Sequence, residues 1–210
     1  MKKILNGIVE FHTTDYVSQK ERYESLRDHQ QPRYLFITCS DSRVVPDLIT
    51  KSQPGELFIL RNIANIVPPY EKAEEYLSSS SAIEYAVEEL NVRHIIICGH
   101  SDCGGCKLML PGKAHTGDMG LTRKWLELAG DVKADIHRFA EERPGLDSHA
   151  LSWHTEQSNV LQQMKNLLTY PSVAERYNSG ELGVHGWHYI IQSGDIYQYN
   201  QESRRFELRN

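Results

Sequence analysis

The fold is decided by the stretch HIIICGHSDCGGC, residues 94–106. Its first half is a run of β-branched residues that ends at a glycine, which is typical of a strand buried on both faces. Its second half carries one histidine and two cysteines where the chain leaves that strand. Parallel α/β sheets gather their ligands beyond the carboxyl ends of the strands. The stretch therefore predicts both a central strand and a site of chemistry at its end.

Three further runs, residues 34–39, 57–60 and 187–192, have the composition of strands. Between the second of these and residues 94–98, apolar residues recur at helical spacing from Ser81 to Leu90. Ser81 is the expected N-cap, and the serines at 78–81 are expected to form a loop that leads into it. Strand, helix and strand in this order predict βαβ units and a parallel sheet.

Helices are also expected at 121–143 and at 151–170, where Pro171 ends the second one. Residues 4–30 have apolar positions at helical spacing with long gaps, which indicates helices too polar for burial in their own core. We predict one α/β domain over residues 1–210, with a central mostly parallel sheet flanked by helices. It comprises an N-terminal helical arm (1–30), an α/β core (31–192) and a C-terminal tail (193–210).

The composition excludes several classes of protein. The chain has 210 residues, of which 40% are hydrophobic and 24% charged, so it has enough apolar residues for a core. Lysine and arginine total 23 against 28 acidic residues, which leaves no basic field for a nucleic acid. No apolar segment approaches the ~18 residues of a membrane span, and no secretory signal is evident. We expect a cytoplasmic protein with neither nucleic acid nor membrane as partner.

The cysteines and a histidine suggest a metal centre. Cys39 ends the first predicted strand, so neighbouring strands would bring it to His100 and Cys103. Two thiolates and one imidazole suit zinc, and we expect one Zn²⁺ per chain. Three protein ligands leave a fourth position open for catalysis, whereas Cys106 or Asp41 as a fourth ligand would close it. Both alternatives stay open at this point.

A carboxylate and a guanidinium lie beside the first predicted ligand. Arg43 can hold Asp41 through two parallel hydrogen bonds. Cys98 lies inside an apolar strand and is expected to be a small buried hydrophobe. His185 and His188 are expected to serve packing or an interface.

Residues 39–43 (CSDSR) together with 99–105 (GHSDCGG) resemble the paired signature of the β-class carbonic anhydrases. The similarity continues through residues 61–65, 68–69, 82–86 and 185–187, so it spans about Gln30 to Gln192. The resemblance implies a zinc lyase in which Cys39, His100 and Cys103 bind the metal. It further implies that zinc-bound hydroxide hydrates carbon dioxide reversibly to bicarbonate and a proton, and that Asp41 and Arg43 are the catalytic dyad.

The family has two types of site, and this chain resembles the plant-like, open type. That type lines its substrate pocket with residues that correspond here to Gln30, Phe58 and Tyr85, all present, and Val44 is expected to add to the apolar wall. The allosteric bacterial type binds bicarbonate with a tryptophan, an arginine and a tyrosine. This chain has Phe36 at the tryptophan position, although Arg61 and Tyr189 could fill the other two. The resemblance also implies a homodimer or tetramer.

Other functions remain possible on these residues. A hydrolase of carbon disulfide or carbonyl sulfide would need the same scaffold and the same hydroxide. A thiol redox protein would use Cys103 and Cys106, and a non-catalytic zinc-stabilised module would need the ligands alone. In an anhydrase a proton must leave after each turnover. Histidine is the natural carrier near neutral pH, but the sequence does not single out one group among the remaining histidines and Tyr85.

Overall fold

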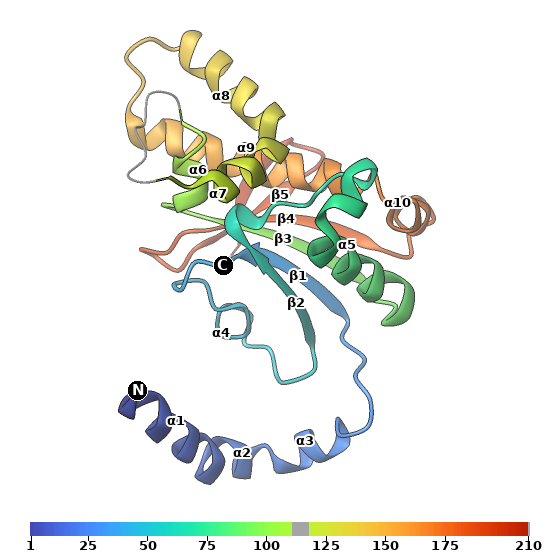
Figure 1. Ribbon diagram of the computed structural model, residues 1–210. Coiled ribbons are helices and arrows are strands. Elements are labelled where there is room, and N and C mark those ends of the chain that lie inside the picture. Colours follow the sequence, from blue (N-terminus) through green and yellow to red (C-terminus); the bar gives the residue numbers. More distant parts are fainter. Residues whose placement is uncertain (111–117, 210) are drawn as a thin grey trace.

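The computed structural model describes residues 1–110 and 118–209, and its centre is a six-stranded sheet (Figure 1). The strand order is β2-β1-β3-β4-β5-β6. The strands are β1 (Tyr34–Cys39), β2 (Leu57–Asn62), β3 (His94–His100), β4 (Gly183–Tyr189), β5 (Ile196–Asn200) and β6 (Arg205–Arg209). The first four in this order run parallel, and the last two pair antiparallel. The predicted α/β class with a mostly parallel sheet is confirmed.

One face of the sheet carries the main core. Alternate residues of the two central strands, Leu35, Ile37, Ile95 and Ile97, are fully buried there. They pack under three helices, α5 (Leu77–Glu84), α9 (Ser148–Leu167) and α10 (Pro171–Asn178). Burying a side chain of this size contributes about 1.5–3 kcal/mol, so the central strands are firmly fixed. Their carboxyl ends are therefore a rigid base for a site.

The other face carries a smaller apolar cluster of Phe36, Ile96 and Cys98, against which Tyr34 and Trp187 pack. Cys98 is completely buried there, as expected for a small hydrophobe. The short helix α4 (Pro46–Thr50) lies near the β2 edge in Figure 1.

The N-terminal arm extends away from the sheet (Figure 1). It consists of α1 (Lys2–Thr13), α2 (Asp15–Ser18) and α3 (Lys20–Ser25), and none of the residues in these helices is buried. Arg22 attaches its end to the body by donating from Nε to the Pro54 carbonyl, 2.9 Å away. Four apolar side chains of α1 are more than half exposed: Ile4 64%, Leu5 56%, Ile8 60% and Val9 63%. The arm is helical, as predicted, and its apolar stripe has no cover within the described chain.

Two expected segments are wrong. The serines at 78–81 are not a loop, because α5 begins at Leu77 and buries Ser79 and Ser80. Ser80 Oγ accepts a hydrogen bond from the Tyr170 hydroxyl at 3.1 Å, which explains how serines fit a packed helix face. Residues 193–209 are not a tail, because β5 and β6 extend the sheet.

Several boundaries also differ. The last parallel strand begins at Gly183 instead of Trp187, and its buried positions alternate. The helix expected at 121–143 is divided into α7 (Gly120–Leu126), a 3₁₀ turn η4 (Glu127–Ala129) and α8 (Gly130–Glu141). Pro171 follows the end of α9, as predicted, but it also starts α10 because proline suits the first helical turn. Within residues 1–110 and 118–209, no helix combines the length and apolar character needed to cross a bilayer.

Candidate metal centre

The three predicted metal ligands meet at the carboxyl ends of β1 and β3. Cys39 ends β1, His100 ends β3, and Cys103 precedes the short helix α6 (Gly104–Lys107). Their ligand atoms all lie within 4.8 Å of one another, and the two Sγ atoms are 4.0 Å apart. All three side chains are buried. They converge because β1 and β3 are adjacent parallel strands in register.

The tautomer of His100 leaves one nitrogen lone pair at the centre. Its Nδ1 lies 2.9 Å from the Ser101 carbonyl, and a carbonyl only accepts, so Nδ1 donates. Nε2 is then the unprotonated nitrogen of the neutral ring. It is buried and has no hydrogen-bond partner among the described residues. A metal-bound histidine characteristically donates its other N–H to a carbonyl in this way.

The sulfur atoms are arranged for a cation. A hydrogen bond with Cys103, together with burial, raises the pKa of Cys39 to about 12. The pKa of Cys103 is also raised, first by a hydrogen bond with Cys106. Two thiols this close would resist ionisation together, and a divalent cation offsets that cost by binding both as thiolates. The buried, unpartnered nitrogen and the paired sulfurs therefore fit a zinc ion.

Asp41 and Arg43 form the predicted dyad. Arg43 donates from Nε to Asp41 Oδ1 at 2.9 Å and from Nη2 to Oδ2 at 2.8 Å, and its backbone N–H donates to Oδ1 at 3.0 Å. The side-chain bonds from Arg43 hold the pKa of Asp41 well below its usual range. Asp41 Oδ2 lies 3.9 Å from His100 Nε2, so the carboxylate borders the metal centre. Arg43 also reaches Asp102, with Nη1 and Oδ2 3.1 Å apart.

Arg61 supports the turn that carries the dyad, a role that the sequence analysis missed. It donates from Nε to the Cys39 carbonyl at 3.1 Å and from Nη2 to the Asp41 carbonyl at 2.7 Å. The sequence feature that could have predicted this role is the position of Arg61 at the end of the second predicted strand, which pairs directly with the first. Val44, which was predicted to line the pocket, is fully buried next to this turn and donates its N–H to the Asp41 carbonyl at 3.0 Å.

A polar stripe on α9 supports the metal loops from behind. Glu156 accepts from the Cys103 N–H at 3.3 Å through Oε1, and its Oε2 lies 3.1 Å from His188 Nε2. Asn159 donates to the Ala64 carbonyl at 2.8 Å, where the backbone has a left-handed φ of 61°. These polar residues are buried because irregular backbone beside them needs partners. Their helical spacing was visible in the sequence, but their partners were not.

Three of the predicted pocket residues lie elsewhere. The rings of Phe58 and Tyr85 pack with centroids 5.9 Å apart, and Gln30 and Tyr85 line one hollow of about 580 Å³. Phe58 pairs with Leu35 in the register of β1 and β2, four residues before Cys39. At 3.3 Å per residue this places Phe58 roughly 13 Å along the sheet from the metal ligand. We call Gln30, Phe58 and Tyr85 the amino-end cluster; within one chain it does not reach the metal centre.

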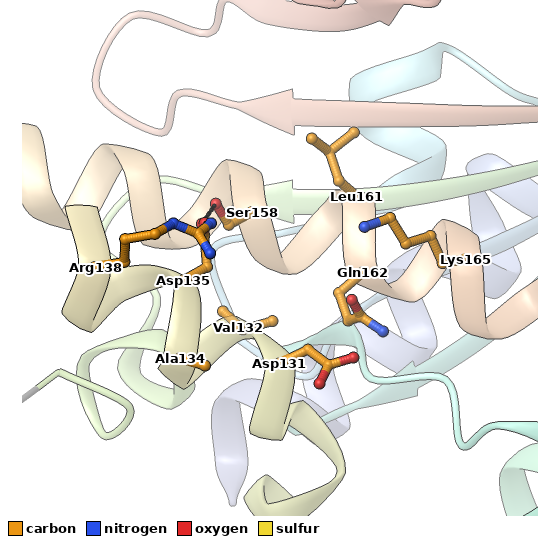
Figure 2. A pocket seen from close by; sticks show the side chains of 9 residues that line it. All are labelled: Asp131, Val132, Ala134, Asp135, Arg138, Ser158, Leu161, Gln162 and Lys165. Carbon is orange, nitrogen blue, oxygen red and sulfur yellow. Dashed lines mark hydrogen bonds and ion pairs between the residues drawn. The ribbon is translucent and has the colours of Figure 1, made fainter.

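A second hollow lies between α8 and α9 (Figure 2). Acidic and basic side chains of the two helices face it, and Asp135 accepts a hydrogen bond from Ser158 at 2.7 Å. Arg138 pairs with the same carboxylate. None of the predicted site residues lines this hollow, so it is separate from the metal centre.

Residues 34–196 match the family model described as "Carbonic anhydrase". The chain belongs to the β-class carbonic anhydrases. It is 42% identical over 205 residues to a carbonic anhydrase of Helicobacter pylori strain J99, a match that covers 96% of this chain and 91% of that protein. A carbonic anhydrase of Synechococcus elongatus is 39% identical over 203 residues, covering 97% and 73% of the two chains.

Solved structures of β-carbonic anhydrases have the same fold as this chain. The β-carbonic anhydrase CcaA superposes with a TM-score of 0.93 at 35% identity, covering all of this chain and 92% of that one. One of the tetrameric β-carbonic anhydrases of Sordaria macrospora gives 0.82 at 31% identity, covering 94% and 95%. The chain is thus an enzyme, a carbonic anhydrase that hydrates carbon dioxide. Because the family match makes this chain a carbonic anhydrase, and Cys103 lies with Cys39 and His100 in a cluster that could hold a metal ion, the thiol redox interpretation has lost its main support.

Proposed function

We propose that this carbonic anhydrase binds one zinc ion per chain through Cys39, His100 and Cys103. The observation that carries the proposal is the buried His100 Nε2, which has no partner among the described residues and lies beside two Sγ atoms 4.0 Å apart. Zinc, when bound, supplies a Lewis acid that makes a water molecule nucleophilic near neutral pH.

Asp41 and Arg43 orient the reacting water. Asp41 is ionised at neutral pH because Arg43 depresses its pKa, so both carboxylate oxygens act only as acceptors. Arg43 fixes the carboxylate plane through its two parallel hydrogen bonds. An O–H held by Asp41 Oδ2 leaves the oxygen lone pair directed at carbon dioxide, which reduces the entropy lost in reaching the transition state. The fully buried Val44 adds an apolar side chain beside this turn.

The same geometry favours the open type of site. With Asp41 engaged by Arg43 on both oxygens, the carboxylate is not free to become a fourth ligand. Cys106 is not part of the group whose ligand atoms cluster within 4.8 Å in the described chain. Both alternatives for closing the site are therefore disfavoured, and a position remains for water and substrate.

The β2 edge of the sheet is suited to a second copy of the chain. Four apolar side chains on β2, α4 and the neighbouring turns are exposed: Val45 42%, Leu48 64%, Ile59 36% and Ile63 42%. β2 is an edge strand, and α4 lies at the same edge in Figure 1. Exposed apolar side chains gathered beside a site are typical of an interface. We infer a homodimer through this edge, two of which would form a tetramer.

Twofold symmetry would complete the site. In a twofold dimer through an edge strand, the same surface of each copy contacts the other. With the twofold axis perpendicular to the strands, the arrangement we propose, the two β2 strands run in opposite directions. The amino end of β2 in one copy then faces the carboxyl end in its partner. This arrangement would bring the amino-end cluster of one copy to the metal centre of the other, which gives Gln30, Phe58 and Tyr85 the substrate-lining role implied by the resemblance.

The proposal is tested by stopped-flow hydration of carbon dioxide with the full-length protein, from about pH 6.5 to 9, after measurement of its zinc content. We expect rapid hydration that rises through mildly alkaline pH, because two thiolates donate negative charge to the metal. One zinc per chain without hydration would contradict an open site. The cytoplasmic location expected from the sequence stays a prediction.

A further inference from the structure

We propose that His29 carries the reaction's proton away from the metal centre of a partner copy. The inference rests on the proposed function and on the twofold arrangement described above. Hydration converts carbon dioxide and water into bicarbonate and one proton, and the proton must reach a base in the solvent before the next turnover. A group that accepts and releases it near neutral pH is therefore required.

The residues of the metal centre cannot fill this role. Both carboxylate oxygens of Asp41 already accept hydrogen bonds from Arg43, at 2.9 and 2.8 Å. Arg43 is a guanidinium, which keeps its proton in proteins. The two thiols and the His100 Nε2 are assigned to the metal. His188 is completely buried behind Cys103 and paired with Glu156, so it has no direct exchange with solvent.

His29 lines the same hollow as two members of the amino-end cluster, Gln30 and Tyr85. The hollow has a volume of about 580 Å³ and is lined by His29, Gln30 and Tyr85 together. His29 itself is exposed, between the end of the arm and the start of β1. The twofold arrangement brings Gln30 and Tyr85 to the partner's metal centre, and His29 comes with them. It would then stand between that centre and the solvent.

The charges around His29 suit a transient imidazolium. Glu89 lines the same hollow from the π-helical turn η3 (Tyr85–Glu89) and brings a carboxylate to it. Arg27 and Asp28 also line it, but they pair with each other, with Nη2 and Oδ2 2.8 Å apart. The proton would pass through water to an imidazole nitrogen, and the imidazolium would give it to a buffer base. No electron is transferred and no further reactant is needed.

The kinetic test uses His29→Ala in the zinc-loaded, assembled protein at several buffer concentrations. At low buffer concentration we expect kcat to fall toward the roughly 10²-fold loss typical of a missing proton-transfer group. The value of kcat/KM should stay unchanged, because carbon dioxide reacts before the proton leaves. Added imidazole should restore kcat in the variant and have little effect on the native protein.

His149→Ala is the matched control. His149 is also exposed, and it lines a different hollow of about 780 Å³ that reaches Arg43 and Asp102 of its own chain. Its removal should leave the buffer dependence unchanged. A kcat that falls in His149→Ala instead of His29→Ala, or in neither, would overturn the proposal. Absence of hydration in the native protein would count against the proposed function itself.

A second readout does not depend on turnover. In protein with Co²⁺ in place of zinc, the ring signals of His29 should broaden relative to the zinc form, because a partner's paramagnetic ion lies near. The broadening should disappear in protein that lacks residues 1–28 if that protein is dissociated, because the ion of the same chain is distant. Equal line widths of His29 in the assembled cobalt and zinc forms would also overturn the proposal.

Discussion

The two ends of the parallel strands differ in how complete they are within one chain. At the carboxyl ends, Cys39, His100 and Cys103 are buried, and their surroundings supply hydrogen bonds from named partners. At the amino ends, Gln30 is exposed and Tyr85 is 45% exposed beside an open hollow. The metal centre is complete within one folded chain. The amino-end cluster, in contrast, is an exposed surface of the kind that a second copy covers.

This contrast has a physical basis. Two thiolates and a neutral imidazole need a desolvated, fixed environment, which only the rigid interior of the sheet provides. A substrate pocket needs an opening, and walls contributed by a second copy leave one. The metal centre should thus tolerate loss of the assembly, and the pocket should not.

The largest effect is expected from Cys39→Ser. A hydroxyl is a poor substitute for a thiolate ligand, so we expect zinc and activity to be lost together. Metal analysis of the purified variant beside a hydration assay measures both. Cys106→Ser is the control and should keep both, which would also dispose of the redox hypothesis. A Cys39→Ser protein with stoichiometric zinc would refute the ligand assignment.

Deletion of residues 1–28 tests whether the amino-end cluster needs a partner copy. The exposed apolar stripe of α1 suggests that the arm contacts a partner copy, so we expect the truncated protein to dissociate. Activity should fall severely, because dissociation removes the partner's amino-end cluster from each metal centre. The zinc content should not change. Sedimentation velocity and metal analysis decide between these outcomes. A truncated chain that sediments as the native oligomer would show that the arm is not needed for assembly.

An intermediate effect is expected from Arg43→Lys. Lysine keeps the charge but loses the planar fork that holds both oxygens of Asp41. Disturbing a group that orients a metal site typically costs about 10–100-fold in activity or metal affinity, and we expect the loss in turnover. Zinc content should be unchanged. Full turnover in this variant would mean that the dyad is incidental.

The smallest effect concerns the response to acid. Arg43 lowers the pKa of Asp41, so the carboxylate stabilises the fold above its ordinary pKa of about 3.9 and loses this contribution only as pH falls through the lowered value. Between about pH 4.5 and 9 the carboxyl ¹³C signal of Asp41 should not shift. In Arg43→Lys it should titrate closer to the ordinary value. A native Asp41 that titrates near pH 5 would contradict the observed pairing.

The strands that were predicted well are those buried on both faces. Residues 34–39 and 94–98 are continuous apolar runs, and both are central strands. β4 was predicted in part, because its buried positions alternate with half-exposed ones and it contains Gly183 and Gly186. β5 and β6 were missed because their side chains are half-buried or exposed and leave little periodic signal.

The serines at 78–81 were misread for a related reason. Serine favours caps and turns in isolation, and only the packing of α5 against Tyr170 makes a helix of this segment. Arg61 and Glu156 were missed as supports of the site because both act on backbone groups distant in sequence. No local pattern records such a contact.

The sequence by itself determined the chemistry of this protein: two cysteines and a histidine at strand ends, with an aspartate and an arginine two residues apart. Residue type and spacing suffice for this because metal preference and bidentate pairing are properties of the side chains. The tertiary structure was needed to show that Arg43 engages both oxygens of Asp41 and that Phe58 of the amino-end cluster lies roughly 13 Å along the sheet from Cys39. Those facts depend on strand order and register, which are fixed by burial across the whole sheet.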